Sequence, residues 1–351
     1  MSDFRIDKIT NRTGETGPQI AGISTFSGTS GMVMPGGPTE YRGGRGRGLF
    51  AGGGYPNYKI DIQKIEIATT GNGVDFGDLV QGVRGPSDGV SSSTRGLFGG
   101  GLGPSSNANV GVINYVTISS EGGANKFGDL SVARFMLRGF SNSTRGVFTG
   151  GYTTSPNQHR NIIDYVTIAS TGNATDFGDV IPPVSGKQYS TYGQGSSPTR
   201  GVFGGGYYAP GVDVAIIQYI TLATRGNSET FGSLTDARRD AGGVSSSTRA
   251  IFAGGTDGGE PNSSNIIDYV TIATLGDATD FGDMAVGGPG RPAGASNSIR
   301  GCFGGGKLSG SSVNTIAYLT IASTGNTVNF GDLTYVGFEL GGCSDSHGGI
   351  G

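Results

Sequence analysis

The chain is built from an internal repeat of about 50 residues, and this repeat restricts its possible folds more than any other feature. The string S-T-R-G-V-F-T-G-G at 143–151 recurs with small changes at 93–101, 198–206, 247–255 and 298–306. A more diverged copy lies at 44–53. Each copy carries an arginine in the same phase: Arg47, Arg95, Arg145, Arg200, Arg249 and Arg300. A Phe-Gly pair recurs in the same phase, with Phe76, Phe127, Phe177, Phe231, Phe281 and Phe330. The two markers agree on six successive units.

The strand pattern inside each unit predicts an all-β fold. Residues 162–169 read I-I-D-Y-V-T-I-A, rich in strand-forming residues and apolar on both alternating faces, so this strand must be covered on both sides. Gly-centred turns such as T-G-N at 171–173 separate it from a short strand that ends in F-G-D. In the fifth unit we expect strands at roughly 242–247, 250–255, 266–274 and 278–282. Helical periodicity is absent.

Four antiparallel strands repeated six times predict a six-bladed β-propeller, in which neighbouring sheets pack face to face around an axis. A seventh blade or an open arrangement is the alternative. Residues 332–347 align without a gap on 233–248 and stop after the first strand of a further unit. We therefore expect 341–347 to supply the innermost strand of the blade built from 48–80, which would hide two open sheet edges and bring the termini together. The segment Tyr41–Gly46 is the other possible source of that strand.

The domain organisation follows from the repeat. Residues 41–351 are predicted to form the propeller, and residues 1–40, which do not repeat, are too few to bury a core of their own. We expect them to form a short attachment arm. The first ten residues lack the apolar core of a signal peptide, and no apolar run is long enough for a membrane-spanning helix. No export signal or membrane insertion is therefore predicted.

Composition argues against several classes of function. The chain has 70 glycines and 14 prolines, which the repeat assigns to turns rather than to disorder. Charged residues make up 15% and the formal net charge is −3, so no nucleic-acid partner is predicted. R-G-G-R-G at 42–46 resembles an RNA-binding box, but it is short and adjoins Arg47 of the repeat. With two His and two Cys, no metal site, cofactor or catalytic site is predicted, and Cys302 and Cys343 are expected to be buried.

The repeat resembles the kelch motif. The shared features are Gly-Gly after a hydrophobic strand, a following strand of V-x-x-Y-D type and an aromatic residue on the fourth strand. Phenylalanine stands where kelch units usually carry tryptophan. This resemblance implies a fold but no particular function.

A second resemblance rests on M-S-D-F-R-I-D-K-I-T-N-R at the start, G-P-Q-I-A-G-I-S-T-F-S-G-T-S-G-M, and the phrases S-T-R-G-V-F-G-G-G and T-I-A-S-T-G-N-A-T-D-F-G-D. These are similar to virion structural proteins of marine tailed phages, cyanophages in particular. The resemblance implies a non-enzymatic component of the tail, baseplate or fibre, made in the host cytoplasm and located in the virion. Its partners would be other virion proteins, bound through residues 1–40. The alternatives are an adhesin that binds host-surface glycan or protein and, less favoured, a polysaccharide hydrolase.

Candidate binding residues come from loops that differ between units, because propeller loops joining strands two and three share one face with the connections between blades. Their aromatic and amide side chains are typical of carbohydrate or protein binding surfaces. The candidates are Tyr152, Asn157, Gln158, His159, Tyr189, Tyr192, Tyr207 and Tyr208. The alternative is that these loops vary because nothing constrains them.

The six repeat arginines are expected on the opposite face. They are interpreted as architectural, each guanidinium bonding carbonyls or a carboxylate of a neighbouring blade, with a cationic mouth as the alternative. The aspartates of F-G-D are interpreted as turn residues: Asp78, Asp129, Asp179, Asp283 and Asp332. Ser233 breaks this series without evident compensation.

Overall fold

The structure is a computed structural model of the chain, described here for residues 25–27, 31–33, 46–54, 57–182, 189–208, 211–259, 261–285 and 287–350. The expected arm, residues 1–40, lies largely outside these ranges, as do residues 41–45. Within the arm, β1 (Thr25–Ser27) and β2 (Gly31–Val33) pair antiparallel. No helix that could span a membrane is found in the described residues.

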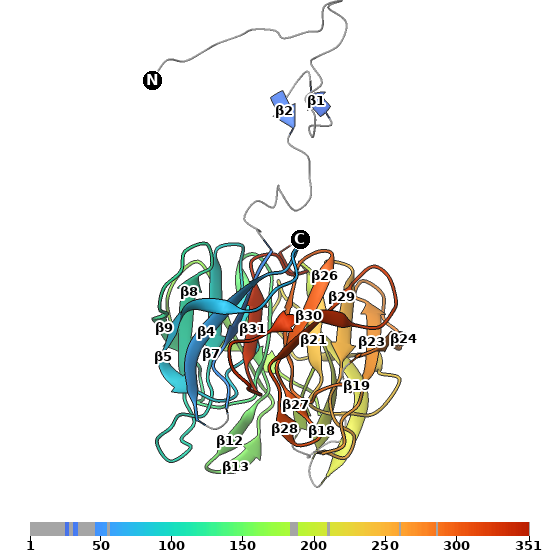
Figure 1. Cartoon of the computed structure of the whole chain (residues 1–351). Helices are drawn as coiled ribbons and strands as arrows, with labels where there is room; N and C mark the ends of the chain where they lie inside the picture. Colours follow the sequence, from blue (N-terminus) through green and yellow to red (C-terminus); the bar gives the residue numbers. More distant parts are fainter. Residues whose placement is uncertain are drawn as a thin grey trace, which may run out of the picture.

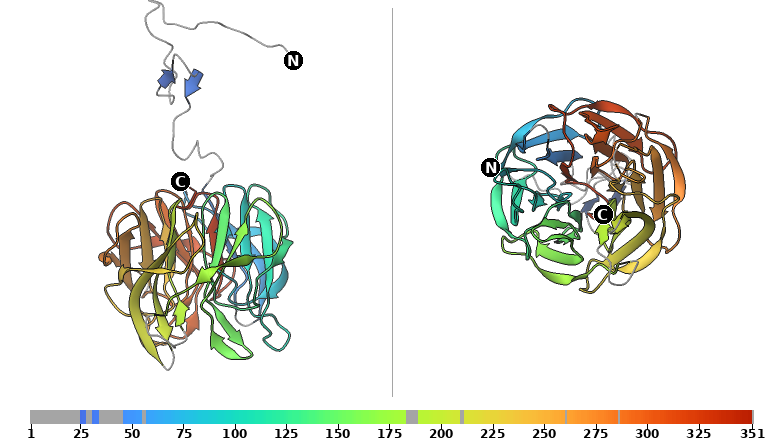
Figure 2. Two further views of the ribbon diagram at one scale, coloured as in Figure 1. Left: turned by 180° about the vertical axis from the view of Figure 1, so that it is seen from behind. Right: turned by 90° about the horizontal axis from the view of Figure 1, so that it is seen from below.

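Six sheets of antiparallel strands surround one axis, so the molecule is a six-bladed β-propeller (Figure 2). Blade 1 consists of β31 (Gly341–Ser344), β3 (Arg47–Ala51), β4 (Lys59–Glu66) and β5 (Val74–Val83). Blade 2 consists of β6 (Val90–Ser91), β7 (Arg95–Gly99), β8 (Val112–Thr117) and β9 (Asn125–Asp129). Blade 3 consists of β10 (Arg138–Ser141), β11 (Arg145–Thr149), β14 (Ile162–Thr167) and β15 (Thr175–Asp179).

The other three blades repeat this order. In blade 4 the inner strand is split into β16 (Tyr189–Thr191) and β17 (Gln194–Ser196). The other strands of this blade are β18 (Arg200–Tyr208), β19 (Val212–Thr221) and β20 (Glu229–Ser233). Blade 5 consists of β21 (Gly242–Ser245), β22 (Arg249–Ala253), β23 (Ile266–Thr271) and β24 (Thr279–Asp283). Blade 6 consists of β25 (Ala293–Ser296), β26 (Arg300–Gly304), β29 (Thr315–Thr320) and β30 (Val328–Asp332).

The C-terminal strand closes blade 1, as the alignment of 332–347 predicts. Strand β31 pairs with β3, and Leu49 lies opposite Cys343. The N–H of Arg47 donates to Asp345 Oδ1 at 3.0 Å, across the break between the two ends of the propeller. In the other blades, the side chain three residues before the arginine makes the same bond, as Asn142 does with the N–H of Arg145. The C-terminal segment therefore supplies both the strand and the turn residue of blade 1.

The hydrophobic cores lie between blades rather than within them. One cluster joins Leu97 and Ile113 of blade 2 to Phe148, Val166 and Ile168 of blade 3. The third strand of each blade contributes to the core on both of its sides, which explains why its two alternating faces are apolar. The second-strand phenylalanines are buried at these contacts: Phe50, Phe98, Phe148, Phe203, Phe252 and Phe303. Both cysteines are buried and free, as expected.

The F-G-D segment of each blade binds the T-G-N turn of the next blade. Gly172 N donates to Phe127 O at 2.9 Å, and Asp129 N donates to Asn173 Oδ1 at 3.0 Å. A Cβ added to Gly128 would lie 2.0 Å from Gly172 O, so the glycine after each phenylalanine is required by the approach of the neighbouring turn. The prediction that the F-G-D aspartates are turn residues is wrong, because Asp129 is the last residue of strand β9.

Ser233, the exception in the F-G-D series, is compensated in the neighbouring blade. Its N–H donates to Asp277 Oδ1 at 2.9 Å, and Asp277 stands where blades 1, 3, 4 and 6 have asparagine in the equivalent turn. An aspartate at both positions would place two carboxylates side by side, which is unfavourable. The two departures from the repeat therefore belong to one contact.

The propeller has two different faces, which we name by their loops. The constant face carries the turns between strands one and two and between strands three and four, together with the C-terminus (Figure 1). The variable face carries the loops between strands two and three and the connections between blades. Two of these loops form extra hairpins that the sequence did not predict, β12 (Tyr152–Thr154) with β13 (Asn157–His159), and β27 (Lys307–Leu308) with β28 (Ser311–Ser312).

Candidate functional site

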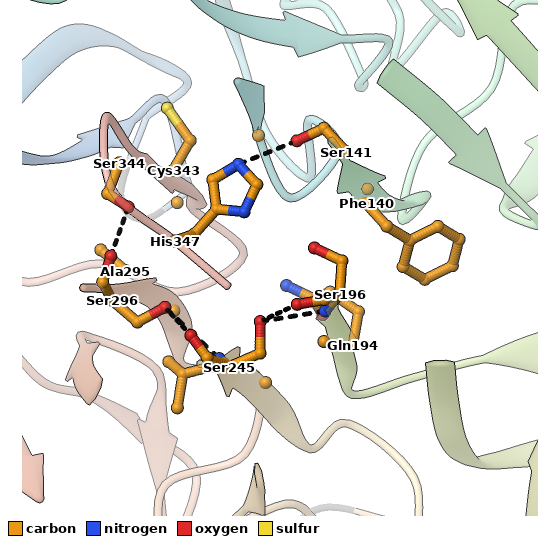
Figure 3. A pocket seen from close by; sticks show the side chains of 17 residues that line it. Phe140, Ser141, Gln194, Ser196, Ser245, Ala295, Ser296, Cys343, Ser344 and His347 are labelled. Carbon is orange, nitrogen blue, oxygen red and sulfur yellow. Dashed lines mark hydrogen bonds between the residues drawn. The ribbon is translucent and has the colours of Figure 1, made fainter. Parts of the chain in front are cut away.

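Six serines surround the axis near the constant face, one at the end of each inner strand, and five of them, all but Ser91, are labelled in Figure 3. Their hydroxyls and backbone groups bond from blade to blade; for example, Ser245 Oγ donates to Ser196 O at 3.0 Å and Ser296 Oγ donates to Ser245 O at 2.9 Å. The members are Ser91, Ser141, Ser196, Ser245, Ser296 and Ser344. This set was not predicted from the sequence, although five of its members stand four residues before a repeat arginine.

The C-terminal tail, Asp345–Ile350, covers the serine ring. His347 is placed at the axis, where Nε2 lies 3.1 Å from Ser141 Oγ and 3.0 Å from Ser91 O. Gly348 N donates to Ser245 O at 3.1 Å, on the other side of the axis. The tail thus connects blades 2, 3 and 5 in addition to blade 1. Burial lowers the pKa of His347 to about 4, so this imidazole is neutral at pH 7.

The contact between Ser141 and His347 brings a hydroxyl and an imidazole together in a way the sequence did not predict, but its geometry does not suit nucleophilic catalysis. Gly349 N donates to His347 Nδ1 at 3.0 Å, so the proton of the neutral ring is on Nε2. The nitrogen facing Ser141 is therefore a donor and cannot accept the hydroxyl proton. Ser141 Oγ also accepts the N–H of Ser91 at 2.9 Å. This geometry is that of a structural contact.

The axial cavity is too small for a sugar or cofactor. Its volume is about 40 Å³, roughly that of three water molecules. The inner strands approach closely because glycine occupies the position two residues before the serine in five blades; a Cβ on Gly294 would lie 2.0 Å from Gly243 O. Blade 4 has Gln194 at this position, and its side chain lines the cavity (Figure 3). A larger ligand must therefore bind elsewhere.

The repeat arginines occupy the contacts between blades. Arg95 Nη1 donates to Ala169 O of blade 3 at 2.8 Å, and its guanidinium lies 5.0 Å from the ring centre of Tyr115 in its own blade. Equivalent carbonyl bonds are made by Arg47, Arg145, Arg200, Arg249 and Arg300. These are the contacts that the architectural interpretation expects. Because each guanidinium is committed to a neighbour, the arginines do not form an open cationic mouth.

The loops of the variable face contact one another around the whole ring. Tyr58 Oη bonds with Asn107 between blades 1 and 2, and Thr154 Oγ1 donates to Asn107 O at 3.5 Å between blades 2 and 3. Gly258 N donates to Asp213 Oδ2 at 2.7 Å between blades 4 and 5. Between blades 5 and 6, Ser309 N donates to Ser263 Oγ at 3.3 Å. The aromatic row and the basic cluster described below complete the ring.

Three of the predicted binding residues come together between blades 3 and 4. Tyr152 and His159 face each other across the β12–β13 hairpin, with 4.8 Å between ring centres, and His159 lies 5.4 Å from Tyr207 of β18. Arg239, which the sequence analysis did not select, stacks 4.2 Å from the Tyr207 ring centre. We call Tyr152, His159, Tyr207 and Arg239 the aromatic row. Burial and the nearby Arg239 lower the pKa of His159 to about 4, so the row carries a neutral imidazole at pH 7.

The other predicted binding residues lie elsewhere. Asn157 and Gln158 are on the same hairpin, with Asn157 exposed. Tyr208 packs against the core between blades 3 and 4, and Tyr189 pairs with it through the backbone. Tyr192 is buried near the axis, 5% exposed, so its selection as a surface binding residue is wrong. Residues 183–188, part of a predicted variable connection, lie outside the described ranges.

Tyr192 belongs to a buried ionic network at the variable-face end of the axis. Arg138 lies 4.9 Å above its ring and pairs with Asp88 at 2.8 Å. Arg291 bridges Asp240 and Glu339, and Arg84 pairs with Glu339 at 2.8 Å. Burial raises the pKa of Tyr192, and the Asp240 carboxylate adds to the effect, so its hydroxyl stays protonated. The network contains three arginines and three carboxylates.

Comparisons with known proteins add no relationship. No protein-family model matches the chain, and no curated protein is similar enough to count as a relative. Among the residues that the structure describes, no group of three or more His, Cys, Asp or Glu side chains could hold a metal ion. The candidate site is therefore the variable face, defined by its interlocked loops, the aromatic row and the ionic network.

Proposed function

We propose that this protein is a non-enzymatic structural component of a phage virion, in the tail, baseplate or fibre, where the propeller acts as a docking or adhesion module. The phrases that resemble those of virion proteins of marine tailed phages support the placement. The observation that carries the proposal is the set of loop-to-loop contacts around the variable face. Loops that diverge without constraint need not contact one another, whereas interlocked loops on a rigid frame form one continuous recognition surface.

The test of the virion proposal uses the first 40 residues, which we propose attach the propeller to neighbouring virion proteins. Phage carrying the full-length gene and phage carrying a version lacking residues 1–40 are purified, and the protein is quantified in each particle. We expect the shortened protein to be made and folded but absent from the virion. Incorporation at the full-length level would contradict the assignment of the arm, and absence of the full-length protein from purified virions would contradict the virion assignment.

A second candidate function, binding of a host-surface glycan, is favoured by the aromatic row. Tyrosine rings offer apolar faces and hydroxyl groups to a sugar, and the neutral His159 imidazole can donate and accept hydrogen bonds. Glycan-array binding by the wild-type protein and by Tyr207→Ala tests this role, with Tyr269→Ala, on the third strand of blade 5, as a control at the arginine contacts. Binding lost only in Tyr207→Ala supports the glycan role. Release of reducing ends from envelope polysaccharide would instead indicate a hydrolase.

A further inference from the structure

Four basic side chains surround the connection between blades 6 and 1 on the variable face. Lys59 Nζ lies 4.8 Å from the ring centre of Tyr335, and Lys307 Nζ lies 4.7 Å from that of Phe338. Arg84 lies 5.9 Å from the same Phe338 ring. Arg291 reaches this connection through its ion pair with Glu339. We call Lys59, Arg84, Arg291 and Lys307 the basic cluster.

In the ion pairs of this cluster the carboxylate is buried and the arginine is partly exposed. The side chain of Arg84 is 34% exposed against 3% for Glu339, and that of Arg291 is 24% exposed against 1% for Asp240. Lys59 and Lys307 make no ion pair among the described residues. Since Glu339 and Asp240 balance the two arginines, Lys59 and Lys307 supply the net positive charge of this place, although the protein as a whole is slightly negative.

The constant face shows the opposite arrangement. In the pair of Lys64 with Glu121 the basic side chain is 17% exposed and the acidic one 58%, and in the pair of Arg47 with Glu66 the values are 9% and 46%. The exposed acids Asp236 and Asp257 lie on the blade 4 and 5 side of the variable face, so its positive region is centred on the contact between blades 6 and 1.

The aromatic rings position Lys59 and Lys307 through cation–π attraction, which occupies none of their hydrogen-bond donors. Tyr335 donates its hydroxyl to Gly52 O at 2.7 Å, and Phe338 is 8% exposed, so both rings are fixed in the protein. A cation held over a fixed ring keeps its donors available to a ligand. The ammonium groups of Lys59 and Lys307 are point charges with three hydrogen-bond donors each, so an anionic group suits the cluster.

We propose that the basic cluster binds the carboxylate or phosphate groups of an anionic polysaccharide, while the aromatic row on the same face contacts sugar rings. This inference rests on the glycan-binding candidate and specifies its ligand class. A polysaccharide fits better than an acidic polypeptide because the face combines anion-binding cations with half-buried tyrosines and a neutral imidazole. Sequence composition did not reveal this cluster, because its four cations come from four separate segments of the chain.

The experiment measures binding of the full-length protein to four polymers by biolayer interferometry at 50 and 300 mM NaCl. Polygalacturonate supplies carboxylates, phosphomannan supplies phosphates, dextran is the neutral control and polyglutamate is the acidic polypeptide. The test variant is Lys59→Gln with Lys307→Gln. The matched control, Lys64→Gln with Lys126→Gln, makes the same change in net charge away from the cluster, and the thermal unfolding of both variants is compared with wild type.

We expect polygalacturonate or phosphomannan to bind, with a Kd that rises about tenfold between the two salt concentrations. The Lys59/Lys307 variant should weaken binding about tenfold, and the Lys64/Lys126 variant by less than about twofold. The polymer that binds identifies carboxylate or phosphate as the anion. Equal binding of polyglutamate would overturn the assignment to a polysaccharide.

Two further outcomes separate this inference from the functions proposed above. Binding of dextran as strong as that of the anionic polymers would overturn the anionic ligand and leave the glycan-binding role standing. Failure of both anionic polymers to bind would overturn the inference, while incorporation into virions would still decide the docking role independently.

Discussion

The two faces of the propeller use the same scaffold in different ways. On the constant face each blade repeats its neighbour, because every turn there must fit the adjacent blade: Asn173 binds the backbone of Asp129, and Arg95 binds Ala169. On the variable face the contacts between neighbouring loops differ at every position around the ring, from the bond of Tyr58 with Asn107 to the stacked His159 and Tyr207. Repetition in this chain therefore marks the contacts between blades, and divergence marks the face for which we propose a recognition role.

The strongest test of this difference removes the closing segment. Deleting residues 340–351 takes away strand β31, the buried Cys343 and the tail over the serine ring, so the melting temperature should fall by more than about 10 °C. Replacing Thr154–Asn157 on the variable face by Asn-Gly should shift it by less than about 2 °C. Differential scanning calorimetry compares the two, and an unchanged melt of the deletion would refute the closure.

A single methyl group tests the contact between blades 2 and 3. Gly128→Ala would place a Cβ 2.0 Å from Gly172 O, a backbone atom that cannot move without shifting the turn. The free energy of unfolding in urea should fall by more than about 3 kcal/mol. Gly172→Ala is the matched control, because its Cβ would meet nothing within 4 Å, and its effect should be below about 1 kcal/mol. Equal effects would show that this close approach is absent.

Acid should lower the free energy of unfolding through His347, which lies near the constant face. Because burial lowers its folded pKa to about 4 from 6.5, the unfolded chain takes up a proton first as the pH falls. The stability that neutral His347 contributes is fully present above about pH 6.5 and is lost as the pH falls toward 4. At pH 4 the free energy of unfolding should be about 3 kcal/mol lower than at pH 7. Urea unfolding of wild type and His347→Gln at pH 7 and pH 4 measures this.

In the His347→Gln variant the loss of unfolding free energy between pH 7 and pH 4 should be smaller by about 3 kcal/mol. The loss that remains includes the smaller contribution of half-buried His159. If wild type and variant lost the same stability between pH 7 and pH 4, His347 would not be buried in its neutral form.

The smallest expected effect concerns Ser233 and Asp277, the pair between blades 4 and 5 that departs from the repeat. Ser233→Asp places a carboxylate beside Asp277 and should cost about 1 kcal/mol at low salt. Adding Asp277→Asn recreates the pair found at Asp129 and Asn173 and should restore stability. A double-mutant cycle measured by urea unfolding at low and high salt gives the coupling, and simple additivity of the two substitutions would contradict it.

Much of the fold could be predicted because it rests on local, repeated residues. The phase of Phe127 and its equivalents gave the number of blades, and the partial unit at 332–347 predicted the closing strand. The aromatic row was found in part, since Tyr152, His159 and Tyr207 stand out in divergent loops. Arg239 was missed because it approaches Tyr207 from the next connection between blades.

Other features could not be predicted from the sequence because they depend on contacts between segments that are far apart in the chain. Tyr192 resembles an exposed loop tyrosine, but the connection turns toward the axis and buries it beside Arg138. Asp240, Arg291 and Glu339 stand at the same place in three successive units, five residues before the inner-strand serine, but the sign of the charge changes between units, so the repeat alone did not reveal an ionic network. The serine ring was visible in the spacing before each arginine, but its role requires knowledge that inner strands approach closely enough for Ser245 to reach Ser196.

The pairing of β3 with β31 also determines when the first sheet can be completed during synthesis. Strands β3, β4 and β5 are translated before the other five blades, but β31, the partner of the inner edge of β3, is translated only after them. Throughout translation that edge offers unpaired backbone groups to any other strand, and nascent chains on one polysome are close together. Protection of this edge until release, by a chaperone or by slow collapse of the early blades, would govern the yield of correctly assembled protein in the cell.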